Sequence, residues 1–497
     1  MLNFLWSTVS SVFIPGILLA IIFVIVLIGV VQTKKILYPL YFLMVWFPIE
    51  SLLLNFVSVE LYSILKYVPE VILYSLLLIL YVKNKQQHRG GIIPHRLQWP
   101  FVAFVVVALL SLVLNWYDPT VWILGVRQMI RFVSVFFIII LAHANEKERK
   151  NLVRLAFVMI FLEVIFGLIQ FGFRGHLDRW LFSTREIMVG SVAILGSNDF
   201  FWTPGTRIFA TMGRYDQLGS FIMLGLVLAL PWLYRGSQQQ RLQYGFGMVL
   251  SCVALILTSS RASWLGVLAG SIMVGYGLFH DKKVWHILGI GVAAVGIYLI
   301  SFMITHDNIV NITEKNNQAL AERILEAGSL RAWRESYEGY GRIFFMVTTP
   351  RTVVADSPLF GVGPGNYGGG VAAALHNTSL YDRLHLPFGV QNTYGQIDNS
   401  WFSLWGELGT LGLLVVVWIF VVLGREAKHV YVKSHDDHTK ALAAGFFGLV
   451  VALAVVGFFG PYFEFRTLMF YFWLIAGLVC TSLRHEDKQG NFLGNKV

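Results

Sequence analysis

The chain changes character between residues 341 and 412. This stretch begins GRIFFMVTTPRTVVADSPLFGVGPGNYGGG (residues 341–370) and ends DNSWFSLWGELGTLG (residues 398–412). Its arginines, its glycine-rich turn and its Asp-Asn pair lie between long apolar segments on either side. We interpret this polar stretch as a reaction chamber, and the apolar segments as a scaffold that holds it against a lipid bilayer.

Composition identifies the scaffold. The 497 residues are 56% hydrophobic and only 13% charged, whereas a soluble domain carries about 25% charged residues. Many apolar runs reach the length of about 18 residues that is typical of a membrane-spanning helix. The alternating segments of roughly ten residues that build a membrane β-barrel are absent from the sequence. The sequence therefore predicts an all-α, polytopic transmembrane helical bundle.

Thirteen segments are long enough to cross the bilayer, or twelve if the break at residues 259–261 is a kink within one passage. They lie near residues 11–31, 36–56, 61–82, 99–115, 121–142, 151–173, 215–234, 243–260, 262–279, 284–304, 400–423, 440–460 and 464–483. The first has no basic region or cleavage site before it, so we expect a retained helix. The chain thus divides into ten spans (residues 1–304), a large, partly helical external loop (305–397), and three spans with a cytoplasmic tail (398–497).

The distribution of Lys and Arg predicts the orientation. Alternate connectors carry Lys, Arg or both, whereas the short connectors at 57–60 and 116–120 carry neither. By the positive-inside rule, the connectors that carry Lys or Arg face the cytoplasm, with the N-terminus outside and the C-terminus inside. The formal charge of +10 follows from the same bias and does not indicate nucleic-acid binding. Two long connectors, about 174–214 and 305–397, then face the periplasm.

Several charged residues fall inside the apolar runs. Lys66 and Glu70 are one helical turn apart, which favours a structural ion pair between them. Arg127 and Arg131 share a helix face and require an acidic partner or a wet cavity. A buried partner such as Glu163 and an anionic lipid headgroup are equally good alternatives at this point.

Four motifs follow one another between residues 207 and 412. They are RIFATMGRYDQLG (207–219), TSSRASWLG (258–266), SPLFGVGPGNY (357–367) and DNSWFSLWGELGTLG (398–412). In this order and spacing they resemble the O-antigen ligase/polymerase superfamily. That superfamily includes lipopolysaccharide O-antigen ligases, Wzy-type polysaccharide polymerases and bacterial O-oligosaccharyltransferases. The resemblance covers roughly residues 200–420.

The resemblance implies a reaction at the outer face of the bacterial inner membrane. A glycan linked to undecaprenyl diphosphate is transferred to an acceptor hydroxyl, without a metal, a nucleotide or another cofactor. In this superfamily arginines hold the diphosphate, and the motifs that carry them match Arg261 and Arg342. Fixed guanidinium groups stabilise the negative charge that develops on a leaving diphosphate. Arg207 and Arg214 lie at the same predicted depth and are further substrate-binding candidates.

The residue expected to accept the proton differs from that of the superfamily. Its His-Asn pair corresponds here to Asp398-Asn399, nine residues before Glu407. The resemblance gives the histidine the role of receiving or orienting the acceptor hydroxyl, and a carboxylate can also serve as a general base. Asp398 is therefore the expected catalytic base, with His376 and His385 of the same loop as alternatives.

Three further residues complete the set of substrate-binding candidates. Asn399 adjoins the expected base, and Trp401 follows two residues later, beside Asp398. An indole there can stack on a sugar ring or on lipid, although interfacial belts are the ordinary explanation of such tryptophans. Arg127 is included because of the possible lipid headgroup contact.

Together these observations predict a glycosyltransferase of the cell envelope. The missing histidine favours a polymerase of O-antigen or exopolysaccharide, with a ligase acting on lipid A core or a protein O-oligosaccharyltransferase as the alternative. A transporter or flippase for the same lipid-linked glycan belongs to another class, and inverted repeats with broken helices would indicate it. A non-catalytic scaffold is a third possibility. The expected partners are the lipid-linked donor, a glycan, lipid A core or protein acceptor, membrane lipid and glycan-assembly proteins.

Overall fold

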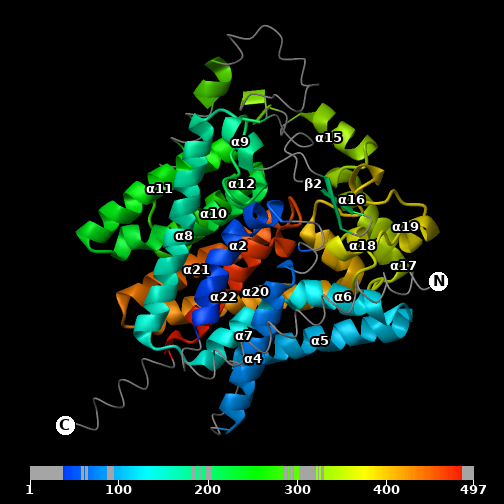
Figure 1. Cartoon of the computed structure of the whole chain (residues 1–497), viewed down its shortest axis with the longest axis horizontal. Helices are drawn as coiled ribbons and strands as arrows, with labels where there is room; N and C mark the ends of the chain where they lie inside the picture. Colours follow the sequence, from blue (N-terminus) through cyan, green and yellow to red (C-terminus); the bar gives the residue numbers. More distant parts are fainter. Residues whose placement is uncertain are drawn as a thin grey trace.

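The structure is a computed structural model that describes most of the helical chain. The described residues are 37–57, 61, 65–86, 95–181, 186–189, 192–195, 204–283, 286, 289, 293, 296–301, 321–322, 324–325 and 329–483. Within these residues the regular secondary structure is helical, except for one short antiparallel hairpin (Figure 1). The predicted all-α bundle is confirmed. The expected span at 11–31 lies outside the described residues, and the span at 284–304 is described only in part.

The elements before the large loop are mostly long helices. They are α2 (Tyr38–Asn55), α4 (Val68–Gln86), α5 (His95–Asn115), α6 (Pro119–Ile130), α7 (Val133–Ala142), α8 (Glu146–Gly172), α9 (His176–Leu181), α10 (Tyr215–Arg235), α11 (Gln238–Thr258), α12 (Arg261–Ile272) and the π-helix η2 (Met273–Leu278). Strands β1 (Glu186–Val189) and β2 (Val192–Leu195) pair with Glu186 opposite Leu195.

The large loop contains short helices, and long ones follow it. The loop helices are α15 (Leu330–Glu338), α16 (Arg342–Thr348), η3 (Thr349–Val353), α17 (Val354–Asp356), α18 (Gly370–Ala374), α19 (Ser379–Arg383) and η4 (Val390–Asn392). After the loop come α20 (Ser400–Lys433), α21 (Asp437–Val456), η5 (Tyr462–Glu464) and α22 (Arg466–Cys480). In Figure 1 the loop helices α15 to α19 gather at one side of the bundle.

Six of the described helices are long and apolar enough to cross a membrane. They are α5, α8, α10, α11, α20 and α21. Helices α6 and α7 lie within the span expected over 121–142 and bend by 56° at Arg131–Phe132; the pair is either a broken span, which would be a seventh passage, or a re-entrant loop. Helices α2 and α22 are apolar but shorter. The chain is an integral membrane protein, and its total of twelve or thirteen spans stays a prediction.

Polar side chains mark where the long helices begin. Asn145 and Glu148 form a reciprocal capping box at the start of α8, and Ser237 with Gln240 does the same for α11. These contacts satisfy backbone N–H groups that have no partner within the helix. At the next break Ser259 has a left-handed conformation with φ of 56°. Helices α11 and α12 are therefore separate elements.

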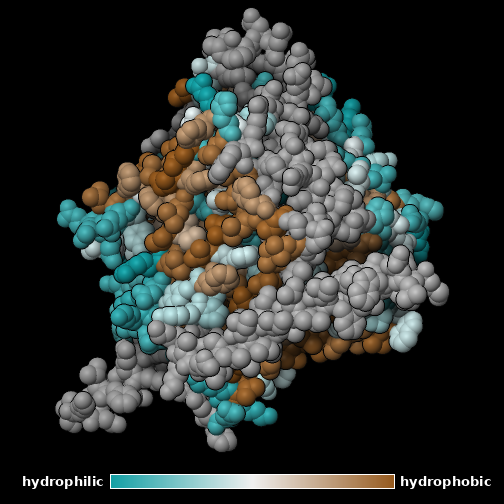
Figure 2. Space-filling model, in the orientation of Figure 1, coloured by the Kyte–Doolittle hydropathy of each residue, from teal (hydrophilic) through white to brown (hydrophobic). Residues whose placement is uncertain are grey.

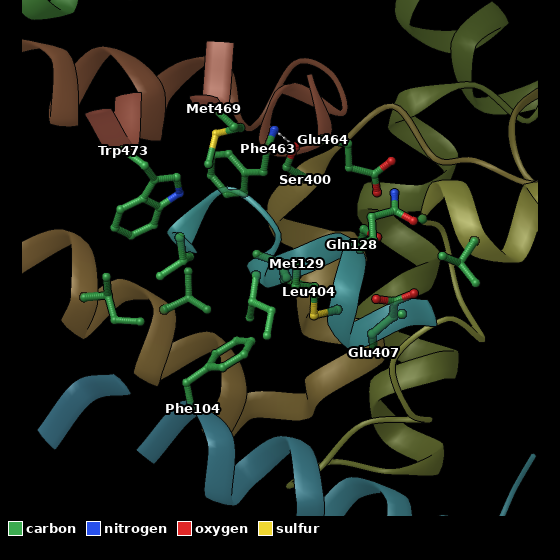
Figure 3. Close-up of a pocket in the computed structure, with 18 of the residues that line it drawn as sticks. Phe104, Gln128, Met129, Ser400, Leu404, Glu407, Phe463, Glu464, Met469 and Trp473 are labelled. Atoms are coloured by element: carbon green, nitrogen blue, oxygen red, sulfur yellow. Dashed lines mark hydrogen bonds between the residues drawn. The ribbon is translucent and has the colours of Figure 1, made fainter. Parts of the chain in front are cut away.

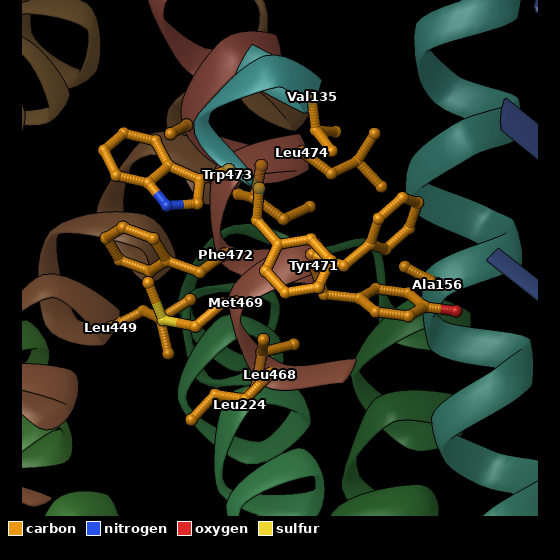
Figure 4. Packing of buried hydrophobic residues seen from close by; sticks show 14 of the residues in the cluster. Val135, Ala156, Leu224, Leu449, Leu468, Met469, Tyr471, Phe472, Trp473 and Leu474 are labelled. Atoms are coloured by element: carbon orange, nitrogen blue, oxygen red, sulfur yellow. The ribbon is translucent and has the colours of Figure 1, made fainter. Parts of the chain in front are cut away.

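Helix α22 lies in the middle of the core. Every residue from Thr467 to Val479 is buried, as expected for a helix that is apolar on all sides within a large bundle. Figure 4 shows its side chains packed among residues of α7, α8, α10 and α21. The loop helices have a smaller core of their own, which includes Phe345, Tyr367 and Tyr381.

The surface divides by hydropathy. On the face shown in Figure 2, apolar residues form a band across the middle, and hydrophilic residues gather toward opposite edges. Exposed apolar side chains are numerous on α5, including Val105, Val113 and Leu114. This pattern is that of a bundle whose belt contacts lipid.

Candidate active site

Arg342 and Asp398 meet where the large loop rejoins the bundle. Arg342 is the first residue of α16, and Asp398 precedes Asn399, the N-cap of α20. The Nε of Arg342 donates to the backbone oxygen of Asp398 at 3.0 Å, and its terminal nitrogen lies 3.7 Å from the Asp398 carboxylate. The arginine is thus held by the backbone while its charged end remains partly exposed.

The glycine turn of the loop fixes the position of α20. The N–H groups of Val362 and Gly363 donate to the carbonyls of Gly406 and Glu407, both at 2.9 Å. The helix is interrupted at Gly409, whose φ of 68° favours glycine. A Cβ on Gly361 would lie 2.4 Å from the backbone nitrogen of Gly409. The turn therefore has a structural role, because it holds the start of α20 relative to the loop.

Arg214 adds a second guanidinium group. It is the N-cap residue of α10 and makes two bonds to Asp216, at 3.0 and 2.7 Å. Its guanidinium carbon lies 5.8 Å from the centre of the Phe465 ring. Asp216 chiefly, and Asp398 to a smaller extent, raise the pKa of Arg214 above its ordinary value. The effect of Asp398 places Arg214 within electrostatic range of the expected base.

Tyr462 joins these groups to the start of α12. Its side chain shares a hydrogen bond with Ser260 and interacts electrostatically with Asp216 and Arg342. Burial raises the pKa of the Tyr462 phenol above its ordinary value, so the phenol stays protonated. Ser260 is the N-cap residue of α12, and Arg261 is the first residue of that helix. Arg261 is exposed.

We call Arg214, Arg261 and Arg342 the arginine cluster. Each lies at the beginning of a helix, namely α10, α12 and α16. The starts of α10 and α12 also lie close together, because a Cβ on Gly219 would be 2.8 Å from the Cβ of Ser260. Helix N-termini and guanidinium groups both favour anions. The arrangement is suited to an anion such as a diphosphate, with the Asp398 carboxylate beside it.

A family comparison agrees with this geometry. Residues 246–417 match the family model of O-antigen ligase. This match supports the resemblance to the O-antigen ligase/polymerase superfamily over these residues. The matched segment includes Arg261, Arg342 and Asp398, whereas Arg214 comes from α10, which precedes it. No curated protein matches the chain. The match supports a ligase-like function in glycan transfer and a place in polysaccharide biosynthesis.

Three other candidates have structural partners. Arg207 is 6% exposed, and its guanidinium stacks on the Tyr215 ring with 4.2 Å between guanidinium carbon and ring centre. Asn399 is fully buried, caps α20 by accepting from the Phe402 N–H at 3.1 Å, and donates to the Phe458 oxygen. The Trp401 indole donates to the Ala454 oxygen at 2.7 Å. These contacts give all three residues a structural role.

Arg127 belongs to a second group of charges, which we call the buried charge network. Its members are Glu50, Glu70, Arg127, Arg131 and Arg466. Arg127 makes two bonds to Glu70, at 2.7 and 2.9 Å. Arg131 and Arg466 lie 3.5 and 3.8 Å from the same carboxylate, and Arg466 also bonds to Glu50 at 2.8 Å. The network joins α2, α4, α6 and α22, so the geometry favours a structural role for Arg127.

The network corrects two expectations. The ion pair between Lys66 and Glu70 is wrong, because Glu70 faces the three arginines of the network. The Lys66 ammonium lies over the Tyr67 ring instead, 4.9 Å from its centre. Glu163 is likewise not the partner of Arg127 or Arg131. Its carboxylate accepts from the Thr211 hydroxyl at 2.6 Å and from the Thr211 N–H at 3.2 Å.

The alternatives to Arg342 and Asp398 lie elsewhere in the loop. Arg331 pairs with Glu335 on exposed α15. The His376 ring packs against Phe388, with 4.8 Å between ring centres. Within the described residues, neither His376 nor His385 hydrogen-bonds to Asp398 or Arg342. The role of Asp398 as the base stays a prediction.

Two members of the site were not singled out from the sequence. Asp216 lies inside the motif that contains Arg214, two residues further on, and that spacing was a usable signal. Tyr462 comes from η5, far along the chain, within an aromatic segment that has no distinctive pattern. Only the folded arrangement shows that its phenol lies among Ser260, Asp216 and Arg342.

Proposed function

We propose that this protein transfers glycan from undecaprenyl diphosphate to an acceptor hydroxyl and acts as a polysaccharide polymerase. One observation carries the proposal. Arg214, Arg342 and the start of α12 with Arg261 come from distant parts of the sequence and are gathered around Tyr462 beside Asp398. A carboxylate next to guanidinium groups at helix starts provides both a base and an anion site.

In the proposed reaction the arginine cluster binds the diphosphate of the donor. The Asp398 carboxylate takes the proton of the acceptor hydroxyl, whose oxygen forms a bond to the anomeric carbon of the donor sugar. The bond between that carbon and the diphosphate oxygen breaks, and its electron pair leaves with the lipid diphosphate. Removing one such stabilising donor from an enzyme typically costs about 10²- to 10³-fold in rate.

The hypothesis that the protein is a polymerase rests on the carboxylate at position 398. A growing glycan presents only sugar hydroxyls, and the base has to receive one proton per transfer. A ligase that uses lipid A core, or a protein O-oligosaccharyltransferase, needs the same donor site and is the second candidate. The superfamily domain supports both readings equally.

The proposed location is the outer face of the bacterial inner membrane. The Lys and Arg distribution places the N-terminus outside and the C-terminus in the cytoplasm. With this orientation the large loop and the arginine cluster face the periplasm, where lipid-linked glycan is presented. The connector before α10 faces the same side.

The test is a reaction with purified protein and its lipid-linked repeat unit, without nucleotide or metal. We expect longer glycans, with one lipid diphosphate released for each glycosidic bond formed. Glycan transferred to added lipid A core or to protein would support the second candidate instead. Translocation of the lipid-linked glycan in liposomes, with no turnover, would overturn the enzyme proposal in favour of a transporter.

A further inference from the structure

A cavity of about 540 Å³ lies inside the bundle, on the other side of residues 397–400 from Arg342. Ile397 and Asn399 line it, whereas the Asp398 between them bonds to Arg342. The volume falls within the roughly 300–1,000 Å³ that is usual for sites of small molecules. The arginine cluster contributes no side chain to its lining. The cavity is therefore separate from the site proposed for diphosphate.

Most of the cavity wall is apolar. Figure 3 shows Phe104, Met129, Leu404, Phe463, Met469 and Trp473 around it. Val102 and Val105 of α5 also line the cavity, and these two residues are exposed, at 44% and 53%. Such a wall suits a hydrocarbon chain, because burying apolar area yields about 25 cal/mol per Å².

One end of the cavity is polar. Figure 3 shows Glu407, Glu464 and Gln128 together on one side, away from Phe104 and Trp473. Both carboxylates reach the same point, because a methyl group on Gly369 would lie 3.1 Å from Glu464 Oε1 and 3.3 Å from Glu407 Oε1. Both carboxylates lie against the backbone at Gly369. The Ile397 N–H closes the turn next to it by donating to the Gly368 oxygen at 3.0 Å.

The two carboxylates retain acceptor capacity. Glu407 accepts from the Gly365 N–H at 3.0 Å and from the Tyr367 N–H. Glu464 accepts from the Gly370 N–H at 3.1 Å, from the Gln396 amide at 3.3 Å and from the Gln128 side chain. An ionised carboxylate offers about four acceptor positions, so each still has at least one. A hydroxyl group can donate to a carboxylate or accept from a carboxylic acid.

The charges around this end discriminate among headgroups. An anionic headgroup would meet two carboxylates in a low-dielectric site, and like charges disfavour each other there. A cationic headgroup would be attracted by the carboxylates but would also meet the positive charge of Arg131, whose guanidinium donates to the Glu464 backbone oxygen at 3.1 Å. An uncharged headgroup with hydroxyls meets neither penalty.

We propose that this cavity binds a long-chain amphiphile with an uncharged, hydroxyl-bearing headgroup, its chain along the apolar wall and its hydroxyls at Glu407 and Glu464. The proposal does not depend on glycan transfer. Its failure would leave the proposed function intact, and the reverse also holds.

The test compares photoreactive probes of one chain length on the full-length wild-type protein in nanodiscs. The probes are a diazirine-bearing hexadecanol, the matching alkyl phosphate and the matching alkyltrimethylammonium, with the crosslinked residues mapped by mass spectrometry. We expect the alcohol to label the cavity walls in α6, α7 and α20 about tenfold more than either charged probe. Monopalmitoylglycerol should displace it.

Two sets of variants sharpen the result. Met129→Trp fills the cavity and should cut labelling about tenfold, whereas Leu109→Trp, on the exposed face of α5 and outside the cavity, should leave it unchanged. Replacing both acids, with Glu407→Gln and Glu464→Gln, should abolish the preference for the alcohol over the phosphate. Thermal unfolding of each variant identifies any that fail to fold.

Three outcomes would overturn the proposal, and the first two need only the wild-type protein. One is equal labelling by the alcohol and the phosphate. Another is displacement by undecaprenyl diphosphate as effective as by monopalmitoylglycerol, which would assign the cavity to the donor's own chain. The third is equal labelling of a folded Met129→Trp protein, which would show that the probe lies outside the cavity.

Discussion

The arginine cluster and the buried charge network use the same residue types in opposite ways. In the network, the side chains of Arg127, Arg131 and Arg466 are 27%, 13% and 25% exposed, and all three face the buried Glu70 carboxylate. In the cluster, the side chains of Arg214 and Arg342 are 44% and 34% exposed. A guanidinium group that faces a buried carboxylate holds helices together, whereas a more exposed one at a helix start can be reached by an incoming anion. The partner and the exposure of an arginine therefore separate structural from functional roles.

The largest effect should follow from breaking the network. Glu70→Ala removes the carboxylate shared by Arg127, Arg131 and Arg466 and leaves buried positive charge without compensation. Losing one partner of a buried pair typically costs about 3–5 kcal/mol. Thermal or denaturant unfolding in detergent measures the change. The exposed pair on α15 is the control, because Glu335→Ala should cost about 0–1 kcal/mol. Equal costs for the two variants would contradict the distinction between the regions.

The next effect concerns the base in the cluster. Asp398→Asn keeps the shape of the side chain, and the Asp398 backbone oxygen still accepts from Arg342. If the carboxylate takes the acceptor proton, kcat should fall about 10²-fold or more, with little change in unfolding temperature. Asp356→Asn, which affects a surface pair with Arg383, is the matched control. Unchanged rates in Asp398→Asn would redirect the search to His376 or His385.

Arg127→Ala tests whether the network also binds substrate. The variant loses two hydrogen bonds to Glu70, and bonds to charged groups contribute about 1.5–3 kcal/mol. We expect lower stability with an unchanged KM for the lipid-linked donor, because Arg127 is neutralised within the bundle. A KM raised about tenfold in a folded variant, equivalent to 1.4 kcal/mol of binding, would restore Arg127 to the substrate site.

The smallest effect is expected at Trp401. Trp401→Phe removes the indole hydrogen bond to the Ala454 oxygen, a loss of about 0.5–1.5 kcal/mol. Packing against Phe420 and Phe463 is largely retained. Kinetic parameters should not change, because the ring lies in the core. A selective loss of acceptor affinity in this variant would indicate sugar stacking and would contradict the structural role.

The sequence was informative about the fold because hydrophobicity is a local property. Long apolar runs predicted the helical bundle, and the polar stretch predicted the loop and the break before α20. Charge pairing was predicted poorly. Lys66 and Glu70 are neighbours in sequence, yet Glu70 pairs with arginines of α6 and α22 that only packing brings near it. Local spacing favours nearby partners, whereas a buried carboxylate takes those that satisfy it in the folded state.

The candidate site shows the same division. Arg261, Arg342 and Asp398 were identified from motifs, and each lies at or next to the beginning of a helix. The motifs did not show that Arg207 stacks on Tyr215 inside the protein, or that Asn399 caps α20. They also gave no sign of Tyr462. These facts depend on contacts between segments that are distant in the sequence.

The central claim is that the arginine cluster holds the diphosphate of a glycan donor. The most direct measurement is the turnover of purified Arg261→Ala and Arg342→Ala proteins with the lipid-linked repeat unit, beside Arg383→Ala, whose arginine forms a surface pair with Asp356 in the same loop. We predict that Arg261→Ala and Arg342→Ala each lower the rate by about 10²-fold or more. Arg383→Ala should keep turnover near that of the wild type, and all variants should have similar unfolding temperatures. Wild-type turnover in both folded Arg261→Ala and Arg342→Ala would contradict the claim.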